Sequence, residues 1–290
     1  MKPLPLSMLL ALVALVALGA QQPAHGQPTP ANEPVQTGAG RLHHLGPFDR
    51  LELGGAAQVR YRQGDRDEVL VEGDEEAQRQ IELSVSNGRL HVRTQRNWWP
   101  WGRSRVKLQI VSRELRELGI SGAADFVAAE PVQSRELRIG ISGAGLARFD
   151  QLQANVLRFS VSGAGDGRFA GQVEELRVGI SGKGDVQAEQ LHARRAQVSI
   201  SGLGKAKLWV GDQLEVTTSG IGTVDYWGQP QVQRRTSGVS QVNGLGEKAA
   251  PSRPAPPAAP ATPAAPTAPA PAASAAAALT PLTVAPPSAS

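Results

Sequence analysis

The chain has 290 residues, a formal net charge of +4, a pI of about 9.7 and no cysteine. The absence of cysteine excludes a disulfide-bonded scaffold, cysteine-ligated zinc, iron–sulfur clusters and thiol catalysis. Five histidines leave few members for a multi-histidine metal site. The weak positive charge does not by itself indicate nucleic-acid binding.

The N-terminal segment has the pattern of an export signal. Lys2 is followed by an unbroken apolar run from Met8 to Ala20, with small residues after it. This run is shorter than the ~20 residues that a helix needs to cross a bilayer, and it fits the apolar part of a secretory signal. We expect residues 1–26 to be a signal peptide cleaved after Ala20 or Gly26, with an uncleaved membrane anchor as the alternative. Because no cysteine follows the run, a lipid-anchored lipoprotein is excluded, and no later segment is apolar enough to span a membrane.

The C-terminal segment, residues 249–290, consists almost entirely of Ala, Pro, Ser and Thr. Its recurring prolines remove backbone donors and break the helix that alanine alone would favour. We expect an extended, disordered spacer, which is either a stalk that carries the domain away from a surface or an unselected terminus. Residues 27–41 predict a shorter linker of the same kind.

One phrase recurs between Leu118 and Gly246: an alternating apolar strand that ends in Ser-Gly. Its serines follow one another at intervals of 18 to 21 residues. Such a fixed period indicates one supersecondary unit that stacks on copies of itself. The members of this serine column are Ser121, Ser142, Ser162, Ser181, Ser201, Ser219 and Ser237.

Each repeat predicts one turn of a β-solenoid. In residues 137–141, 157–161 and 176–180 the apolar positions alternate with an Arg and a small residue, always in the same register. Alternation with period two puts the apolar side chains inside and an arginine column outside. A Gly-rich corner and a shorter strand follow each Ser-Gly, and no helical stretch of useful length is visible. The sequence therefore predicts an all-β, single-stranded parallel β-helix with turns of about 20 residues.

Residues 42–112 predict the less regular start of the same domain, which we place at residues 42–248. Further short alternating strands occur here, and Asn87-Gly88 between two of them favours a tight hairpin turn. The ends of the stack need caps, because each turn leaves its strand edges open until the next turn covers them.

Several phrases together resemble a known family. They are Phe48-Asp-Arg-Leu-Glu-Leu-Gly-Gly, a strand closing on Gln63-Gly64, Asn87-Gly-Arg-Leu-His-Val, and the serial Gly-Ile-Ser-Gly-Ala-Gly turns. This ordered set is similar to the head GIN domain, also called the putative autotransporter adhesin head domain, over about residues 45–246. The resemblance implies a single-stranded β-helix in an exported bacterial protein at the cell envelope, and it implies no established enzymatic activity.

The serine column does not predict a hydrolase. The order Gly-x-Ser-Gly without a following helix differs from the Gly-x-Ser-x-Gly nucleophile elbow, and His192 is the one histidine in the repeats. We expect corners in which hydroxyls bond the backbone and glycine adopts positive φ. A second column, four residues after each serine, includes Asp166 and Asp185, which are either solvated turn residues or an acid/base pair for a sugar bond.

The segment Asn97-Trp-Trp-Pro-Trp-Gly102 holds three of the five tryptophans and is flanked by basic residues. Aromatic faces beside guanidinium groups suit sugar rings, acidic glycans or a lipid headgroup layer. The alternative is a hydrophobic cap over an open end of the solenoid. We predict a ligand-binding site at Arg96, Trp98, Trp99, Trp101 and Arg103.

The remaining candidates predict little chemistry. His43-His44 has no partner at metal-ligand spacing, so we expect no metal, no cofactor and no catalytic residue. The arginine column of Arg138, Arg158 and Arg177 makes one sheet face basic, for an acidic polymer or as plain surface charge.

The sequence as a whole predicts an exported, non-catalytic β-solenoid in the periplasm or at the cell surface. Its expected partner is an envelope glycan, a lipid surface or another protein, and not nucleic acid. One alternative is a polysaccharide-acting enzyme built on the β-helix. Another is a structural protein that self-assembles as a homo-oligomer through an uncapped turn.

Overall fold

The computed structural model describes residues 35–37, 40–73, 75–94 and 106–248, all of which lie in one compact unit. The irregular first part comprises β1 (Val35–Thr37), β2 (Gly40–His44), β3 (Arg50–Leu53), β4 (Ala57–Gln63), β5 (Glu68–Glu72), α1 (Glu75–Arg79), β6 (Ile81–Ser86), β7 (Arg89–Thr94) and β8 (Val106–Ser112). The regular part comprises β9 (Glu117–Ile120), β10 (Ala124–Ala128), β11 (Val132–Ile141), β12 (Ala144–Val161), β13 (Ala164–Ile180), β14 (Lys183–Ile200), β15 (Leu203–Thr218), β16 (Ile221–Trp227), β17 (Gln231–Thr236) and β18 (Val239–Gly244).

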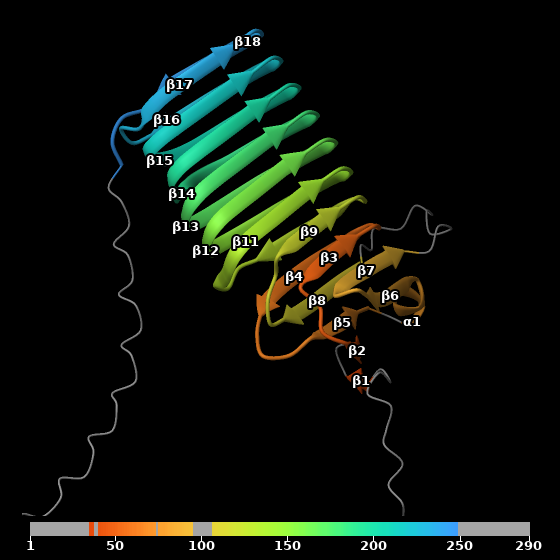
Figure 1. Ribbon diagram of the computed structural model, residues 1–290. Coiled ribbons are helices and arrows are strands. Elements are labelled where there is room, and N and C mark those ends of the chain that lie inside the picture. The colour runs from red at the N-terminus through yellow and green to blue at the C-terminus, as the bar shows by residue number, and fades with distance from the viewer. Residues whose placement is uncertain (1–34, 38–39, 74, 95–105, 249–290) are drawn as a thin grey trace, which may run out of the picture. The chain divides into compact units, whose positions relative to one another are not determined.

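The regular part is a β-solenoid of about six turns, each of about 20 residues, as the sequence predicts. Successive turns pair in parallel and nearly in register, so that Leu137, Leu157 and Leu176 stand over one another. The stacked strands run from β9 to β18 in Figure 1. Each Ser-Gly corner divides the turn into two segments, and these segments build two faces around one core.

We call the two faces the leading face and the trailing face. The leading face contains the segments that follow each corner, together with β2, β5, β8, β4 and β10 at its N-terminal end and β16 and β18 at the other. The trailing face contains the segments that precede each corner, together with β6, β7, β3, β9 and β11, and it ends at β17.

The N-terminal end departs from the parallel pattern. Here β1, β2 and β5 pair antiparallel, and β6 pairs antiparallel with β7 through the predicted hairpin. Asn87 at its tip adopts a positive φ of 51°, as this kind of turn requires. One short helix, α1, lies between β5 and β6; the sequence pattern does not show it because five residues are too few for a helical period.

The Ser-Gly corners repeat one set of backbone hydrogen bonds. The N–H groups of Ser142 and Gly143 both donate to the carbonyl oxygen of Ile120, at 2.9 and 3.2 Å. The N–H of Ala144 donates to the carbonyl oxygen of Gly122 at 3.0 Å. The same bonds recur at each of the next four corners.

Glycine is required at these corners for a reason different from the predicted one. The Ser-Gly glycines do not adopt positive φ. Instead, a Cβ added at Gly143, Gly163 or Gly182 would collide with the carbonyl oxygen of the glycine one turn earlier. Glycine is therefore retained because successive turns approach each other too closely for a side chain.

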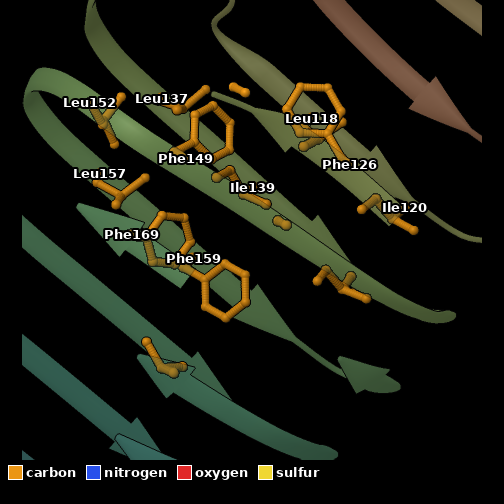
Figure 2. Close-up of a cluster of buried hydrophobic side chains, with 14 of the residues drawn as sticks. Leu118, Ile120, Phe126, Leu137, Ile139, Phe149, Leu152, Leu157, Phe159 and Phe169 are labelled. Atoms are coloured by element: carbon orange, nitrogen blue, oxygen red, sulfur yellow. The ribbon is translucent and has the colours of Figure 1, made fainter. Parts of the chain in front are cut away.

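The core contains an aromatic ladder that crosses from turn to turn. Tyr61, Phe126, Phe149 and Phe169 follow one another with ring centroids 5.6, 5.4 and 6.0 Å apart. Phe159 reaches from the trailing face and meets the edge of Phe169 at 5.2 Å. Figure 2 shows the four phenylalanine rings among Leu and Ile side chains of the core. The ring contacts add to the free energy gained from burial alone.

The far corner at the C-terminal end is fastened by Lys248. Its ammonium group donates to the carbonyl oxygen of Glu189 at 2.6 Å and lies over the rings of Trp209 and Trp227, at 5.1 and 5.8 Å from their centroids. Trp209 is buried and its ring meets His192 edge-on, so it packs within the last turns. One side chain thus joins three successive strands, β14, β15 and β16.

The glycine requirement is tested by two alanine substitutions in one turn. We expect Gly182→Ala to destabilise the protein by about 2 kcal/mol or more, because its Cβ would overlap the backbone of Gly163. Gly179→Ala should be close to neutral, since a Cβ there meets nothing within 4 Å. Urea unfolding followed by circular dichroism measures both, and equal midpoints for the two variants would contradict this account.

Candidate functional site

The predicted aromatic site lies outside the described residues. Arg96, Trp98, Trp99, Trp101 and Arg103 all fall between the end of β7 and the start of β8. Both flanks of this segment are described and lie at the Ser-Gly corner: Val106 pairs with Ala57 on the leading face. Thr94 lies beside Gly55, over which Gly122 of the next corner stands.

The predicted basic face is neutralised. Arg138 and Arg158 both donate to the Glu136 carboxylate, at 3.0 and 2.9 Å, and these bonds hold the pKa of Glu136 below its usual value. Arg177 donates to Glu175 at 2.5 Å. Because each arginine of this column faces a carboxylate, the trailing face does not present a row of free positive charge.

The serine column borders a shallow groove of about 370 Å³ on the trailing face. Its walls are glycine and serine residues of successive turns, and Glu52 is the one charged group among the described residues that line it. Ser121 and Ser181 donate to the carbonyl oxygens of Leu53 and Val161, as predicted for corner hydroxyls. No histidine lines the groove within the described chain, so the Ser–His pair of a serine nucleophile is not found there.

The second predicted column is real, and it brings Asp166 and Asp185 together. These residues are in register on adjacent turns, between Leu146 and Lys205. The N–H of Asp185 donates to the Asp166 carboxylate at 3.2 Å. The column therefore holds one carboxylate by a backbone bond of the next turn, which is what a structural turn aspartate does.

A larger groove, of about 590 Å³, lies on the leading face. Its volume falls within the usual range of small-molecule sites. Arg60 and Arg62 of β4 and Lys107 of β8 line it, together with Val127 of β10 and Leu146 of β12. Glu72, Asp125 and Glu130 line it as well, so the groove combines cationic, acidic and aliphatic side chains.

The cations of this groove have no ion-pair partner. No salt bridge joins Arg60, Arg62 or Lys107 to a carboxylate elsewhere in the described chain, and all three side chains are exposed. The Glu72 carboxylate, which also lines the groove, accepts a hydrogen bond from the Gln109 amide. The carboxylates of the lining equal its cations in number, but no salt bridge within the described chain fixes the three cations, so they can still donate hydrogen bonds to an anionic ligand.

The same face carries further free cations along the solenoid. Arg168 stands one turn from Arg148, whose guanidinium is paired with Asp150 at 2.7 Å. Lys205 and Lys207 follow on β15, and neither they nor Arg168 forms a salt bridge with another described residue. The arginine column of the trailing face is thus held by carboxylates. On the leading face Lys205 and Lys207 lie in register beside Asp185 and Asp225 without forming a salt bridge to them.

Sequence reasoning missed the groove on the leading face. The alternation of Gln58, Arg60 and Arg62 predicts outward side chains on β4, but it does not say which strands lie beside them. Parallel pairing places β10 on one side of β4 and β8 on the other. The groove therefore depends on the order of the strands, which no local sequence motif predicts.

Neither a metal centre nor a membrane-spanning helix is found within the described ranges. No group of three or more His, Asp or Glu side chains there is arranged to hold an ion. His43 is half-buried, and burial, aided by Arg41, lowers its pKa. No helix in this part of the chain has the length and apolar character needed to cross a bilayer.

The buried phenol of Tyr61, beside the groove, makes the stability of the fold depend on pH. Burial raises the pKa of Tyr61 to about 12, although its hydroxyl is 3.0 Å from the Ser112 hydroxyl. An unfolded tyrosine ionises near pH ~10, so the stabilising effect of the buried neutral phenol is complete below that pH and is lost as pH rises toward 12.

Between pH 10 and 12 the free energy of unfolding of the parent protein should decrease as Tyr61 ionises in the unfolded state. In Tyr61→Phe this decrease should be smaller by about 1–2 kcal/mol. Urea unfolding at each pH, referred to the value of the same protein at pH 7, measures this difference. Parallel pH profiles for the two proteins would show that Tyr61 does not carry the effect.

Comparisons with known proteins agree with this architecture. The crystal structure of a putative adhesin from Bacteroides fragilis is 19% identical, with a TM-score of 0.68 over 71% of this chain and 95% of that one. A putative adhesin from Parabacteroides distasonis is 20% identical, with a TM-score of 0.58 over 71% and 98%. A putative lipid binding protein from the same species is 20% identical, with a TM-score of 0.56 over 71% and 95%. At this level of identity the likeness shows a shared fold.

No curated protein matches the chain. A family model does: "putative auto-transporter adhesin, head GIN domain" matches residues 47–230, which is more than half of the sequence and covers both the irregular start and most of the regular turns. The chain therefore belongs to the head GIN domain family.

Proposed function

We propose that this protein is an exported, non-catalytic adhesion domain that binds an acidic glycan of the bacterial envelope through its leading face. The observation that carries the proposal is a set of exposed cations on that face that form no salt bridge with another described residue, among them Arg60, Arg62 and Lys107 of the groove. Membership of an adhesin-like family supports a binding role, and so do the solved relatives described as putative adhesins.

The repeat suits a polymer better than a small anion. Arg168, Lys205 and Lys207 extend the positive charge over several turns, at intervals set by the spacing of parallel strands, ~4.8 Å per turn. A chain with regularly spaced carboxylates or sulfates can meet several of these cations at once. Weak single contacts then add up to a strong overall affinity.

The aromatic segment is the proposed anchor of this surface. Trp98, Trp99 and Trp101 precede β8, whose second residue, Lys107, lines the groove. Tryptophan faces stack on sugar rings, and Arg96 and Arg103 supply forked donors for acidic groups. The competing role for the same segment is a hydrophobic cap, which would contribute to stability and not to binding.

Export and domain organisation complete the proposal. Residues 1–26 act as the signal peptide, residues 27–41 as a linker, residues 42–248 as the binding domain and residues 249–290 as a disordered spacer. The predicted location is the periplasm or the cell surface, where acidic polysaccharides are accessible.

A lipid surface is the second candidate ligand. The groove contains the aliphatic side chains of Val127 and Leu146 beside its cations, a combination that suits binding to the headgroup region of anionic lipids. The relative from Parabacteroides distasonis described as a putative lipid binding protein points the same way. Vesicles of anionic lipid are therefore tested beside the glycans.

The charge argument predicts a difference between two triple variants. Arg60→Ala, Arg62→Ala and Lys107→Ala together should weaken binding to an acidic glycan by about tenfold or more and should reduce its salt dependence. The matched control is Arg138→Ala, Arg158→Ala and Arg177→Ala, which removes the same charge from the paired column.

Glycan-array binding and titration calorimetry at two salt concentrations measure this effect. An equal loss of glycan affinity in the two variants would contradict the placement of the binding site on the leading face. Binding to anionic vesicles and to no glycan would replace the glycan by lipid as the ligand.

The tryptophan segment is tested separately with Trp98→Ala, Trp99→Ala and Trp101→Ala combined. We expect loss of saturable glycan binding with an unchanged circular dichroism spectrum and thermal midpoint, because stacking on sugar is lost while the solenoid is kept. A lowered thermal midpoint with intact binding would instead show that the segment is a cap.

A further inference from the structure

The C-terminal turn leaves two strand edges open. β17 pairs with β15 and β18 pairs with β16, and no other described strand pairs with either of them. At the opposite end the edge strands are β1 and β6, and each of them joins its neighbour antiparallel and not in parallel. An open edge presents unpaired N–H and C=O groups to any further strand.

The two open edges differ in their protection. In β17, Arg234 occupies the core-facing position that Val216 occupies one turn earlier, and Arg235 pairs with Glu215 at 3.1 Å. Arg234 is itself exposed, and charged side chains on an edge strand discourage the addition of a further strand. β18, in contrast, reads Val-Ser-Gln-Val-Asn-Gly and contains neither a charge nor a proline.

An exposed apolar ridge ends on the unprotected edge. Leu203, Ile221 and Val239 stand in register on three successive turns, with exposed fractions of 53, 58 and 72%. Leu245, just after β18, is 49% exposed. These four are the exposed large hydrophobic residues of the described chain, and they gather at its C-terminal turns. Exposed apolar residues gathered in this way mark interaction surfaces.

The sequence of this edge is self-complementary about Val242. On each side of Val242 the sequence has the same order of residue types: first an amide, then a small residue, then an aliphatic residue. In an antiparallel pair of two identical strands centred on Val242, residues of like character therefore lie opposite each other. The opposed pairs are Val242 with Val242, Gln241 with Asn243, Ser240 with Gly244 and Val239 with Leu245.

We propose that β18 is the docking strand of a two-fold homodimer, in which a second copy of the chain adds its own β18 antiparallel to the first. The pairing buries exposed apolar residues at both ends of the paired strands, because it sets Val239 of each copy against Leu245 of the other. The occupant is a second copy because the palindromic pattern fits an isologous contact. This inference stands independently of the proposed glycan ligand.

The protected strand gives the dimer a distinctive salt dependence. Pairing of the β18 edges brings the two β17 edges toward each other, and each carries Arg234 and Arg235. Their mutual repulsion is screened by salt, so the dimer becomes tighter as ionic strength rises. A complex held by complementary charges would respond in the opposite direction.

Sedimentation velocity of the full chain over a range of concentrations tests the proposal. We expect a concentration-dependent dimer that tightens with salt and that weakens by about tenfold or more in Val239→Lys or Leu245→Lys. Arg234→Thr should tighten the dimer at low salt. The matched control is Ile221→Lys, on the same ridge but one turn away from the edge, which should leave the affinity near the parent value.

A cysteine reporter checks the register directly, because the chain has no native cysteine. Directly opposed residues of an antiparallel pair have Cα atoms ~4.5–5.5 Å apart, a separation that a disulfide spans. Val242→Cys should therefore give a cross-linked dimer on mild oxidation, whereas Ser240→Cys should not. A monomer at every concentration and salt, or equal cross-linking of the two variants, would overturn the proposal.

Discussion

The close approach of one turn to the next at the Ser-Gly corner is the constraint on which this structure depends. Each corner glycine stands over a carbonyl oxygen of the preceding corner, with no room for a side chain between them. Because the turns are so close, the backbone N–H groups at each corner donate to carbonyl oxygens of the preceding turn. The hydrogen bonding between turns therefore continues through the corner from the trailing face to the leading face. A side chain at one corner would separate two turns along their whole length, since the strands are joined on both sides of it.

Uniform stacking has a consequence for charge. Because turns superpose in register, a residue type repeated at one position becomes a column, and columns of like charge repel. The trailing face resolves this by placing Glu136 and Glu175 beside its arginines. The leading face leaves several cations outside any salt bridge with the described residues, so a ligand can supply a counter-charge there. Adhesion and stability would thus be linked on that face.

Much of the fold could be predicted from the sequence, because a period repeated seven times averages out local ambiguity. The reason for the corner glycines could not, since steric overlap between turns is a property of the stacked structure and φ is a property of one residue. The pairing of the arginine column was visible in principle: Glu136 and Glu175 lie two residues before Arg138 and Arg177, on the same side of a strand. The groove on the leading face depends on the order of β8, β4 and β10, which no single phrase encodes.

The position of Lys248 also determines how mechanical force enters the domain. Residue 249 begins the Ala/Pro-rich segment, so tension applied through that segment is first borne by the preceding lysine. Its contacts with Glu189, Trp209 and Trp227 distribute the load over three strands at once and not over the last turn alone. Without such contacts, tension on the C-terminal end would separate the turns of the solenoid one after another, each at low force. Because these contacts join β14, β15 and β16, we expect the last three turns to yield together under such tension.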